Sequence, residues 1–271
     1  MPVQTHAAKS GSRTSGARAN GRLQVALPEP GLSMTQDAEW CVVRVDNQWR
    51  QIRFHDYEQL YSVPGLYEKV IYDILGCDSP HTVRDLLETE LRQTGTPPDS
   101  LRVLDLGAGN GMVAEELADL GVPSIVGVDL INEAAAAARR DRPSLYRDYF
   151  VTDMTRLNRR EQQSLSDHEF NTLVCVAALG FGDIPPAAFA AAFDLIATGG
   201  WIAFTIKEDF LGDEDRSGFA GLIQSILADG TLELRQRRRY QHRLATNRKP
   251  LFYEAIIGVK RRDLPTGYRP E

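Results

Sequence analysis

The hydrophobic positions follow two different arrangements along the chain. From residue 102 onwards, short apolar runs alternate with stretches whose apolar residues recur at helical spacing. Because strands that alternate with helices form parallel sheets, this order predicts an α/β fold. The expected strands are residues 102–106, 124–128, 149–151, 172–178 and 201–206. Two last runs, 232–244 and 252–259, have no helix between them, so they predict a terminal hairpin that adds an antiparallel strand to the sheet.

The N-terminal part has a different pattern. Residues 40–45 and 49–54 flank an Asp-Asn turn and predict a short hairpin, which helical stretches follow. The first 28 residues contain no Asp or Glu and are rich in Ser, Gly, Ala and Arg, which is typical of a disordered tail. The alternatives are a transit peptide and an upstream mis-start, with Met34 as the real start. We therefore expect three parts: a disordered tail (1–36), an N-terminal hairpin and helical lid (37–98), and the main α/β domain (99–271).

The composition changes this picture little. Apolar residues make up 42% and charged residues 25% of the 271 positions, as in ordinary globular proteins. No apolar run is long enough to span a bilayer, and the three cysteines are widely spaced, so we expect a cytoplasmic protein without a disulfide framework. The net charge of −6 disfavours general binding to nucleic acid. The five histidines are isolated, and no metal is expected.

The sharpest motif is the glycine-rich segment 103–111, Val-Leu-Asp-Leu-Gly-Ala-Gly-Asn-Gly, which follows an expected strand. Glycines at such a turn allow positive φ and close approach of a ligand. Residues 109–114 fit the dinucleotide pattern G-x-G-x-x-G/A, and residues 105–111 fit the pattern D-x-G-x-G-x-G. Asp105 favours the second interpretation, because an acid pointing at the turn would repel a pyrophosphate and suit a ligand that carries an ammonium and a sulfonium.

With these residues the chain resembles the class I S-adenosylmethionine-dependent methyltransferases over about residues 99–262, and within them the small type-11-like enzymes, a group that includes the Williams–Beuren region methyltransferase. The resemblance implies a Rossmann-like, mostly parallel seven-stranded sheet. It also implies that Asp105 lies by the methionine end of the cofactor, that Asp129 binds both ribose hydroxyls and that Asp153 accepts from the adenine amino group. The implied cofactor-binding residues are Asp105, Gly107, Ala108, Gly109, Gly111, Asp129, Leu130, Asp153, Met154 and Ala178.

Two of these acids have alternative interpretations. Asp129 could cap the next helix, although Asn132 is better placed to do so, and Asp153 could be an ordinary turn aspartate.

The implied reaction is in-line transfer of the methyl group from S-adenosylmethionine to a small-molecule acceptor, which leaves S-adenosylhomocysteine. The weak candidates for a catalytic role are Asp183, Glu208, Tyr57 and Tyr61, with Asp209 and His55 beside them. Tyr57 and Tyr61 are four residues apart and would share one helix face over the methionine end, or would pack in the core. Phe181 and Phe210 are expected near the acceptor, since substrate loops in this fold follow the C-terminal ends of the strands.

Other functions remain open. The basic cluster between Arg235 and Arg243 would suit a protein or RNA acceptor, although arginines on an exposed strand also form a solvated face. The motif after the fourth strand that base N-methyltransferases carry, Asn/Asp-Pro-Pro-Tyr, is replaced by residues 177–180, Ala-Ala-Leu-Gly, which disfavours that activity. A cofactor-binding protein without transfer activity and a nicotinamide oxidoreductase are the remaining alternatives.

Overall fold

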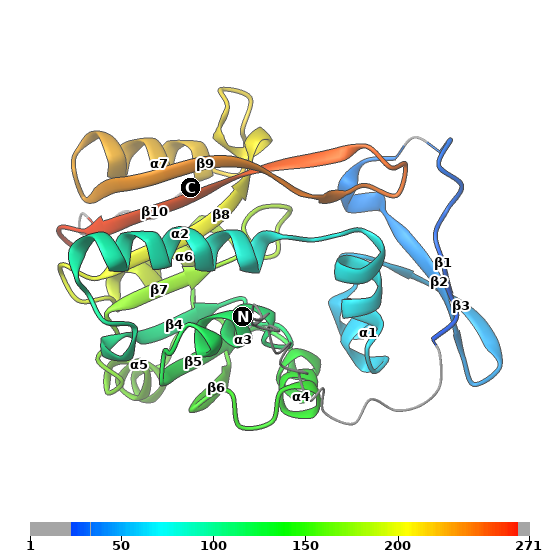
Figure 1. Ribbon diagram of the computed structural model, residues 1–271, viewed down its shortest axis with the longest axis horizontal. Coiled ribbons are helices and arrows are strands. Elements are labelled where there is room, and N and C mark those ends of the chain that lie inside the picture. The colour runs from blue at the N-terminus through cyan, green and yellow to red at the C-terminus, as the bar shows by residue number, and fades with distance from the viewer. Residues whose placement is uncertain (1–22, 33, 265–271) are drawn as a thin grey trace, which may run out of the picture.

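A seven-stranded sheet forms the centre of the molecule (Figure 1). The computed structural model describes residues 23–32 and 34–264. The strands lie in the order β6-β5-β4-β7-β8-β10-β9. In chain order they are β4 (Arg102–Leu106), β5 (Ser124–Asp129), β6 (Asp148–Val151), β7 (Thr172–Cys175), β8 (Trp201–Lys207), β9 (Leu232–Leu244) and β10 (Pro250–Lys260).

Five of these strands run parallel, and the last two close the sheet as an antiparallel hairpin. β4 pairs in parallel with β5 and β7, whereas β10 pairs antiparallel with both β8 and β9. All four residues of β7 are buried, as expected for a central strand that is covered on both faces. The Rossmann-like α/β fold with its terminal hairpin is therefore confirmed.

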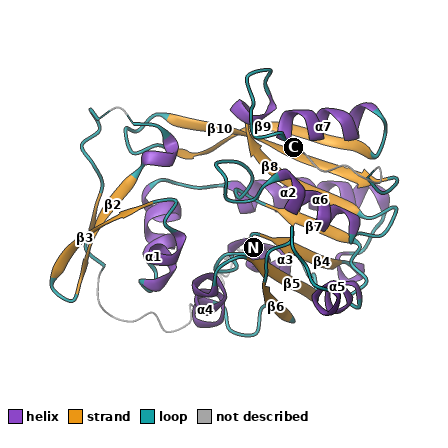
Figure 2. Ribbon diagram, turned by 180° about the vertical axis from the view of Figure 1, so that it is seen from behind, coloured by secondary structure: helices purple, strands orange, loops and turns teal. Residues whose placement is uncertain are grey.

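Helices cover both faces of the sheet (Figure 2). Buried side chains of α5, α6 and α7 join one hydrophobic core, and those of α2 and α3 join a second core. The helices and short 3₁₀ segments of this domain are α2 (Ser79–Thr94), η3 (Pro98–Ser100), α3 (Met112–Asp119), α4 (Asn132–Asp141), α5 (Arg159–Ser166), α6 (Pro186–Asp194), η4 (Glu208–Leu211) and α7 (Phe219–Ala228). The C-terminal ends of the parallel strands thus remain accessible to another part of the chain.

That part is the N-terminal lid, which has a small core of its own. Its elements are β1 (Val25–Ala26), η1 (Gln36–Ala38), β2 (Trp40–Val45), β3 (Gln48–Arg53), α1 (Tyr57–Ser62) and the π-helical segment η2 (Glu68–Ile74). β1, β2 and β3 form an antiparallel sheet. Helix α1 packs on α4, where Tyr61 contacts Ala134 and Ala137 (Figure 1). The expected hairpin and lid are therefore present.

A buried ion pair joins the lid to the far end of the chain. Arg243 Nη2 lies 2.6 Å from Glu39 Oε2, and the two side chains are 4% and 1% exposed. The second oxygen of Glu39 accepts from the backbone N–H of Thr246. Since loss of one partner would leave a buried charge uncompensated, this pair fixes the lid against β9.

Two of the expected boundaries are wrong. Residues 23–32 do not belong to a structureless tail, because β1 pairs with β2 and its neighbours Leu23 and Leu27 pack against the lid core. The composition predicted a tail here because these apolar residues lie in a stretch that is otherwise mostly polar. Residues 1–22 lie outside the described residues. Helix α2 was expected in the lid, but it packs on the sheet with α3, because its apolar face is buried in the second core.

The packing of residues 23–32 leads to a prediction. A chain that starts at residue 34 should melt several degrees below a chain that starts at residue 23, because it lacks a strand and the side chains of Leu23, Val25 and Leu27. Thermal unfolding followed by circular dichroism compares the two chains directly. Equal melting temperatures would show that β1 contributes nothing to stability.

Candidate functional site

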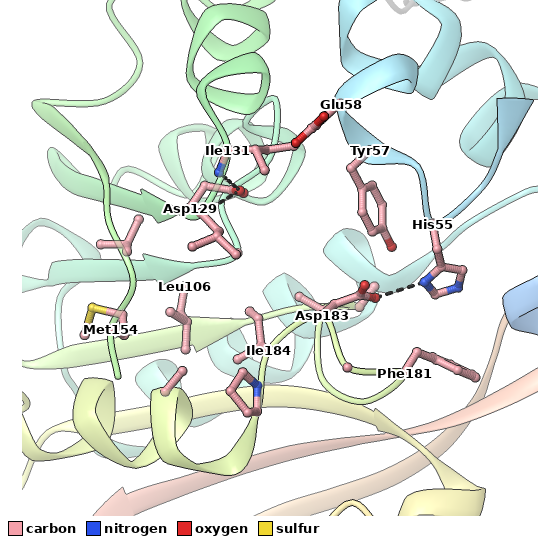
Figure 3. A pocket seen from close by; sticks show the side chains of 18 of the residues that line it. His55, Tyr57, Glu58, Leu106, Asp129, Ile131, Met154, Phe181, Asp183 and Ile184 are labelled. Carbon is pink, nitrogen blue, oxygen red and sulfur yellow. Dashed lines mark hydrogen bonds and ion pairs between the residues drawn. The ribbon is translucent and has the colours of Figure 1, made fainter. Parts of the chain in front are cut away.

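A cavity of about 660 Å³ lies between the lid and the C-terminal ends of β4, β5 and β7 (Figure 3). This is the position at which open α/β sheets bind their ligands. In Figure 3, Asp129 and Met154 lie toward one end of the cavity, and His55, Asp183 and Phe181 lie toward the other. The lid contributes residues between 53 and 67, and the strand ends contribute Leu106, Gly107, Val128 and Asp129. The following loops contribute Leu130, Ile131, Thr152, Asp153, Met154 and residues 176–178 and 181–185.

The glycine turn after β4 has the conformation that its sequence predicts. Gly107, Gly109 and Gly111 have φ values of 73°, 54° and 91°, a region that residues with a Cβ rarely adopt. Gly107 lines the cavity, whereas Gly109 lies beneath the lid: a Cβ there would be 2.4 Å from the hydroxyl of Tyr61. Ala108 is buried, and Gly111 lies against Arg142. The turn is therefore covered by a tyrosine of α1.

Asp129 ends β5 and lines the cavity. Its Oδ2 accepts from the N–H of Gly109 at 2.9 Å, and its Oδ1 accepts from the N–H groups of Leu130 and Ile131 at 2.8 and 3.3 Å. Burial raises the pKa of this carboxyl, and these three backbone donors oppose the rise. A carboxylate has about four acceptor positions, so these three donors leave Asp129 about one position for a further donor.

The expected cap at Asn132 is wrong. Helix α4 begins at Asn132, and the residue before it, Ile131, makes no side-chain cap. The carboxylate of Asp129 instead serves the two backbone N–H groups that precede the helix. Asp129 therefore binds backbone N–H groups just before α4, which is close to its alternative interpretation as a helix cap. The same residue also lines the cavity.

Asp153, Met154, Leu130 and Ala178 also line the cavity. Asp153 Oδ1 accepts from the backbone N–H and the hydroxyl of Thr155, and these bonds lower the pKa of the carboxyl. Leu130 is an unusually exposed apolar side chain, at 61%. Three apolar side chains and one carboxylate therefore line this part of the cavity.

Asp105 is not where the sequence placed it. Its side chain is buried and does not line the cavity; instead it accepts a hydrogen bond of 2.8 Å from the hydroxyl of Tyr146. The same hydroxyl lies 3.3 Å from the carbonyl of Ala108, so the pair supports the glycine turn from inside the domain. Burial raises the pKa of the Asp105 carboxyl to about 7, against the effect of the Tyr146 hydrogen bond.

This raised pKa predicts a pH-dependent stability. An unfolded aspartate titrates near 3.8, so the folded protein holds the extra proton between about pH 4 and pH 7, and its stability falls as the pH rises through that window. Relative to Asp105→Asn, the wild type should lose roughly 2 to 3 kcal/mol of unfolding free energy between pH 5 and pH 8. Urea unfolding of both proteins measures this difference. A difference that does not change with pH would contradict it, and Tyr146→Phe should extend the loss of stability to higher pH, because the Tyr146 hydrogen bond lowers the pKa of the Asp105 carboxyl.

The catalytic candidates divide into two groups. Tyr57, Tyr61 and Asp183 line the cavity, and Asp183 Oδ2 lies 3.0 Å from Nδ1 of His55 (Figure 3). Glu208 does not line the cavity and pairs with Arg239. The sequence could not show this, because β9 lies beside Glu208 only in the folded sheet. Asp209 also lies outside the cavity lining and pairs with Lys207 at 2.5 Å.

The loop after β7 positions Asp183 through unusual backbone conformations. Ala177 and Phe181 have φ values of 57° and 54°, which non-glycine residues adopt rarely and mainly where surrounding structure enforces them. The ring of Phe181 packs between His55 and Phe210, with centroid distances of 5.1 and 5.0 Å. Phe181 therefore lines the cavity as expected, and Phe210 stands behind it.

Comparison with known proteins identifies the family to which this geometry belongs. A family model described as a methyltransferase domain matches residues 79–251, more than half of the chain. The chain belongs to this family. The family expected from the glycine turn is thereby confirmed.

Several methyltransferases are similar to this chain in sequence or in structure. The ubiquinone biosynthesis O-methyltransferase of Thiobacillus denitrificans is 30% identical over 112 residues, which are 41% of this chain and 47% of that protein. That of Burkholderia vietnamiensis is 32% identical over 108 residues, 38% of this chain and 43% of that protein. The chain thus spans about half the length of these relatives.

Solved structures are similar at the level of the fold. A proposed RNA methyltransferase from Pyrococcus horikoshii has a TM-score of 0.50 at 14% identity and covers 69% of this chain and 88% of its own. The N-methyltransferase NodS from Bradyrhizobium japonicum, in complex with S-adenosylhomocysteine, has a TM-score of 0.49 at 16% identity and covers 77% and 98%.

Some residues of this methyltransferase-domain cavity were missed by the sequence. Tyr67 of the lid and Thr152 after β6 line the main cavity. A side chamber of about 40 Å³ shares His55 and Asp183 with it and is lined by Gln36, which lies in the segment expected to be a tail. Tyr67 lies six residues beyond Tyr61 and outside the spacing that Tyr57 and Tyr61 share, and nothing in the sequence linked Gln36 to the site.

The basic cluster of this methyltransferase-domain protein lies on β9, at the edge of the sheet. Arg235 pairs with Glu90, Arg237 pairs with Glu254, and Arg243 pairs with Glu39. These charges are largely neutralised by neighbouring acids, so they form a salt-bridged strand face.

Residues 23–32 and 34–264 contain neither a candidate membrane span nor a candidate metal cluster. Within these ranges no helix is both long enough and apolar enough to cross a bilayer. The same part of the chain holds no group of three or more His, Cys, Asp or Glu side chains that could bind a metal ion.

Proposed function

We propose that this protein transfers the methyl group of S-adenosylmethionine to an oxygen of a small-molecule acceptor. The observation that carries the proposal is the His55–Asp183 pair, 3.0 Å apart, in the same cavity as Asp129. One end of the cavity therefore offers acceptors for a nucleoside, and the other offers a base for a hydroxyl group. The relatives named as O-methyltransferases support an oxygen acceptor.

The cavity fits the proposed cofactor. Its volume of about 660 Å³ lies in the usual range for sites of small ligands and cofactors. Asp129 would accept from a ribose hydroxyl at the position that its three backbone bonds leave, and Asp153 would accept from the adenine amino group beside Leu130 and Met154. Asp105, by contrast, would act through the glycine turn, because it is buried and does not line the cavity. When bound, S-adenosylmethionine supplies an electrophilic methyl group on a good leaving group.

His55 would act as the general base. Asp183 accepts from Nδ1–H, which leaves Nε2 with a lone pair for the proton of an acceptor hydroxyl. The imidazolium that forms is stabilised by the Asp183 carboxylate. Phe181 packs against the imidazole ring, and Tyr57 and Phe181 provide aromatic walls for the acceptor. Holding the reactants in line would supply much of the rate enhancement.

The proposed cofactor site predicts the effect of changing Asp129. Asp129→Ala should weaken binding of S-adenosylhomocysteine at least tenfold, since hydrogen bonds to a charged group contribute about 1.5–3 kcal/mol each. The loss should be larger than the ribose alone explains, because the carboxylate also holds the N–H of Gly109. Titration calorimetry measures it, with Asp148→Ala as a control at the other end of the neighbouring strand. Equal affinities for wild type and Asp129→Ala would contradict this role.

The function is tested with S-adenosylmethionine labelled in its methyl group and a panel of phenols, alcohols, thiols and amines. Transfer to hydroxyl compounds, inhibited by S-adenosylhomocysteine, is the expected result. Transfer only to amines or thiols would reject the oxygen acceptor. Binding of NADH at micromolar concentration without any binding of S-adenosylhomocysteine would reject the methyltransferase activity itself.

A macromolecular acceptor is the second candidate, but the contacts on β9 do not favour it. The arginines that would contact an RNA or an acidic peptide are paired with Glu39, Glu90 and Glu254. Methyl transfer to total RNA that falls steeply with salt would favour this alternative.

A further inference from the structure

Four polar side chains join the lid to the glycine turn outside the cavity. They are Glu68 of η2, Asn110 of the turn, Glu115 of α3 and Arg142, which directly follows α4. None of them lines the cavity. Any effect of this cluster on the site must therefore be transmitted through the elements that carry its members.

Glu68 is the member that connects the two parts. Its Oε1 accepts from Asn110 Nδ2 at 2.9 Å and from Arg142 Nη1 at 2.7 Å. The same Nη1 lies 3.2 Å from the carbonyl oxygen of Asn110. The Arg142 side chain is only 9% exposed and Asn110 is 2% exposed, so these charge-assisted hydrogen bonds are largely shielded from water.

The position of each residue gives the cluster its effect. Asn110 lies between Gly109 and Gly111, at the centre of the turn. Glu68 is the first residue of η2 and directly follows Tyr67, whose ring packs on Tyr61 at a centroid distance of 4.9 Å. Tyr61 in turn covers Gly109. The carboxylate thus fixes one end of the tyrosine layer that forms the lid side of the cavity.

We infer that Glu68 is a positioning residue that holds the lid on the glycine turn, so that cofactor affinity depends on a carboxylate that does not touch the cofactor. This inference rests on the proposed function for the identity of the ligand, but the lid contact itself does not. Without Glu68, Arg142 still has Glu115 at 2.9 Å, so its charge remains compensated within the domain. What is lost is the hydrogen bonding of η2 to Asn110 and Arg142, while α1 still packs on α4 and Glu39 still pairs with Arg243.

Glu115 therefore provides a matched control. Glu68→Ala and Glu115→Ala each remove one carboxylate from Arg142, but only the first removes a lid contact. Glu68→Ala should weaken S-adenosylhomocysteine about tenfold in titration calorimetry, Glu68→Gln should fall between it and the wild type, and Glu115→Ala should stay within about twofold of the wild type. Equal losses in the two alanine variants would mean that cofactor affinity depends only on how many carboxylates pair with Arg142, and would overturn the inference.

Hydrogen exchange without ligand tests the contact independently of the proposed function. In Glu68→Ala the amides of α1 and η2 should exchange at least tenfold faster than in the wild type, while those of β4 and β7 should not change. Unchanged exchange in α1 and η2 would overturn the inference whatever the protein binds. If wild type shows no affinity for S-adenosylhomocysteine but the exchange result is as expected, the proposed function fails and the role of Glu68 in holding the lid stands.

Discussion

Replacing Gly109 by valine is expected to abolish measurable binding of S-adenosylhomocysteine while leaving the fold largely formed. The backbone at Gly109 has a φ of 54°, which is strained for a branched side chain and costs roughly 1–3 kcal/mol. A Cβ there would also lie 2.4 Å from the hydroxyl of Tyr61, so the buried Tyr61 side chain would have to shift off the turn. A shift of the turn backbone would also displace the N–H that Gly109 donates to Asp129.

The control for this variant is Gly95→Val. Gly95 ends α2 with a φ of 68°, and a Cβ there meets nothing within 4 Å. Both variants should lose similar stability from backbone strain, but only Gly109→Val should lose binding in titration calorimetry. Near-normal binding by Gly109→Val would mean that the ligand lies away from this turn.

The second large effect is expected at His55. With a hydroxyl acceptor identified from the panel, His55→Ala should lower kcat by about 10² to 10⁴, the usual contribution of a general base. The affinity for S-adenosylhomocysteine should change little, because His55 lies at the opposite end of the cavity from Asp129 (Figure 3). Asp183→Asn should lower kcat less, since it retains an acceptor for Nδ1–H but loses the charge.

Steady-state kinetics with the identified acceptor checks this assignment. His81→Ala, on the exposed face of α2, is the matched control and should behave as the wild type does. If His55→Ala keeps a wild-type kcat, another group takes the proton, or none is needed.

Local patterns in the sequence predicted the parts of the molecule that depend on neighbouring residues. The alternation of strands and helices predicted the sheet. Of the residues that the family resemblance placed at the cofactor, six line the cavity: Gly107, Asp129, Leu130, Asp153, Met154 and Ala178. The other four, Asp105, Ala108, Gly109 and Gly111, do not. The position of Asp129 at the cavity could be predicted because this residue ends a buried strand, and that placement does not depend on contacts with distant segments.

The wrong or missing predictions concern contacts between distant segments. Asp105 was expected to face the ligand, but Tyr146, 41 residues away, takes its carboxyl into the interior. Glu208 was expected to be a catalytic candidate, but its carboxylate pairs with Arg239 of β9. The His55–Asp183 pair spans 128 residues and follows no spacing rule. Burial and long-range pairing decide such cases, and a single sequence shows neither.

The ion pair between Glu39 and Arg243 has a consequence for how the protein is made. Its partners are 204 residues apart, so during synthesis Glu39 leaves the ribosome long before Arg243 exists. Closing so long a loop carries an entropic cost that is recovered only when the contacts form. We expect the lid to dock last, after β9 and β10 have joined the sheet. A chain interrupted before β9 would then keep its lid undocked, with the carboxylate of Glu39 in water.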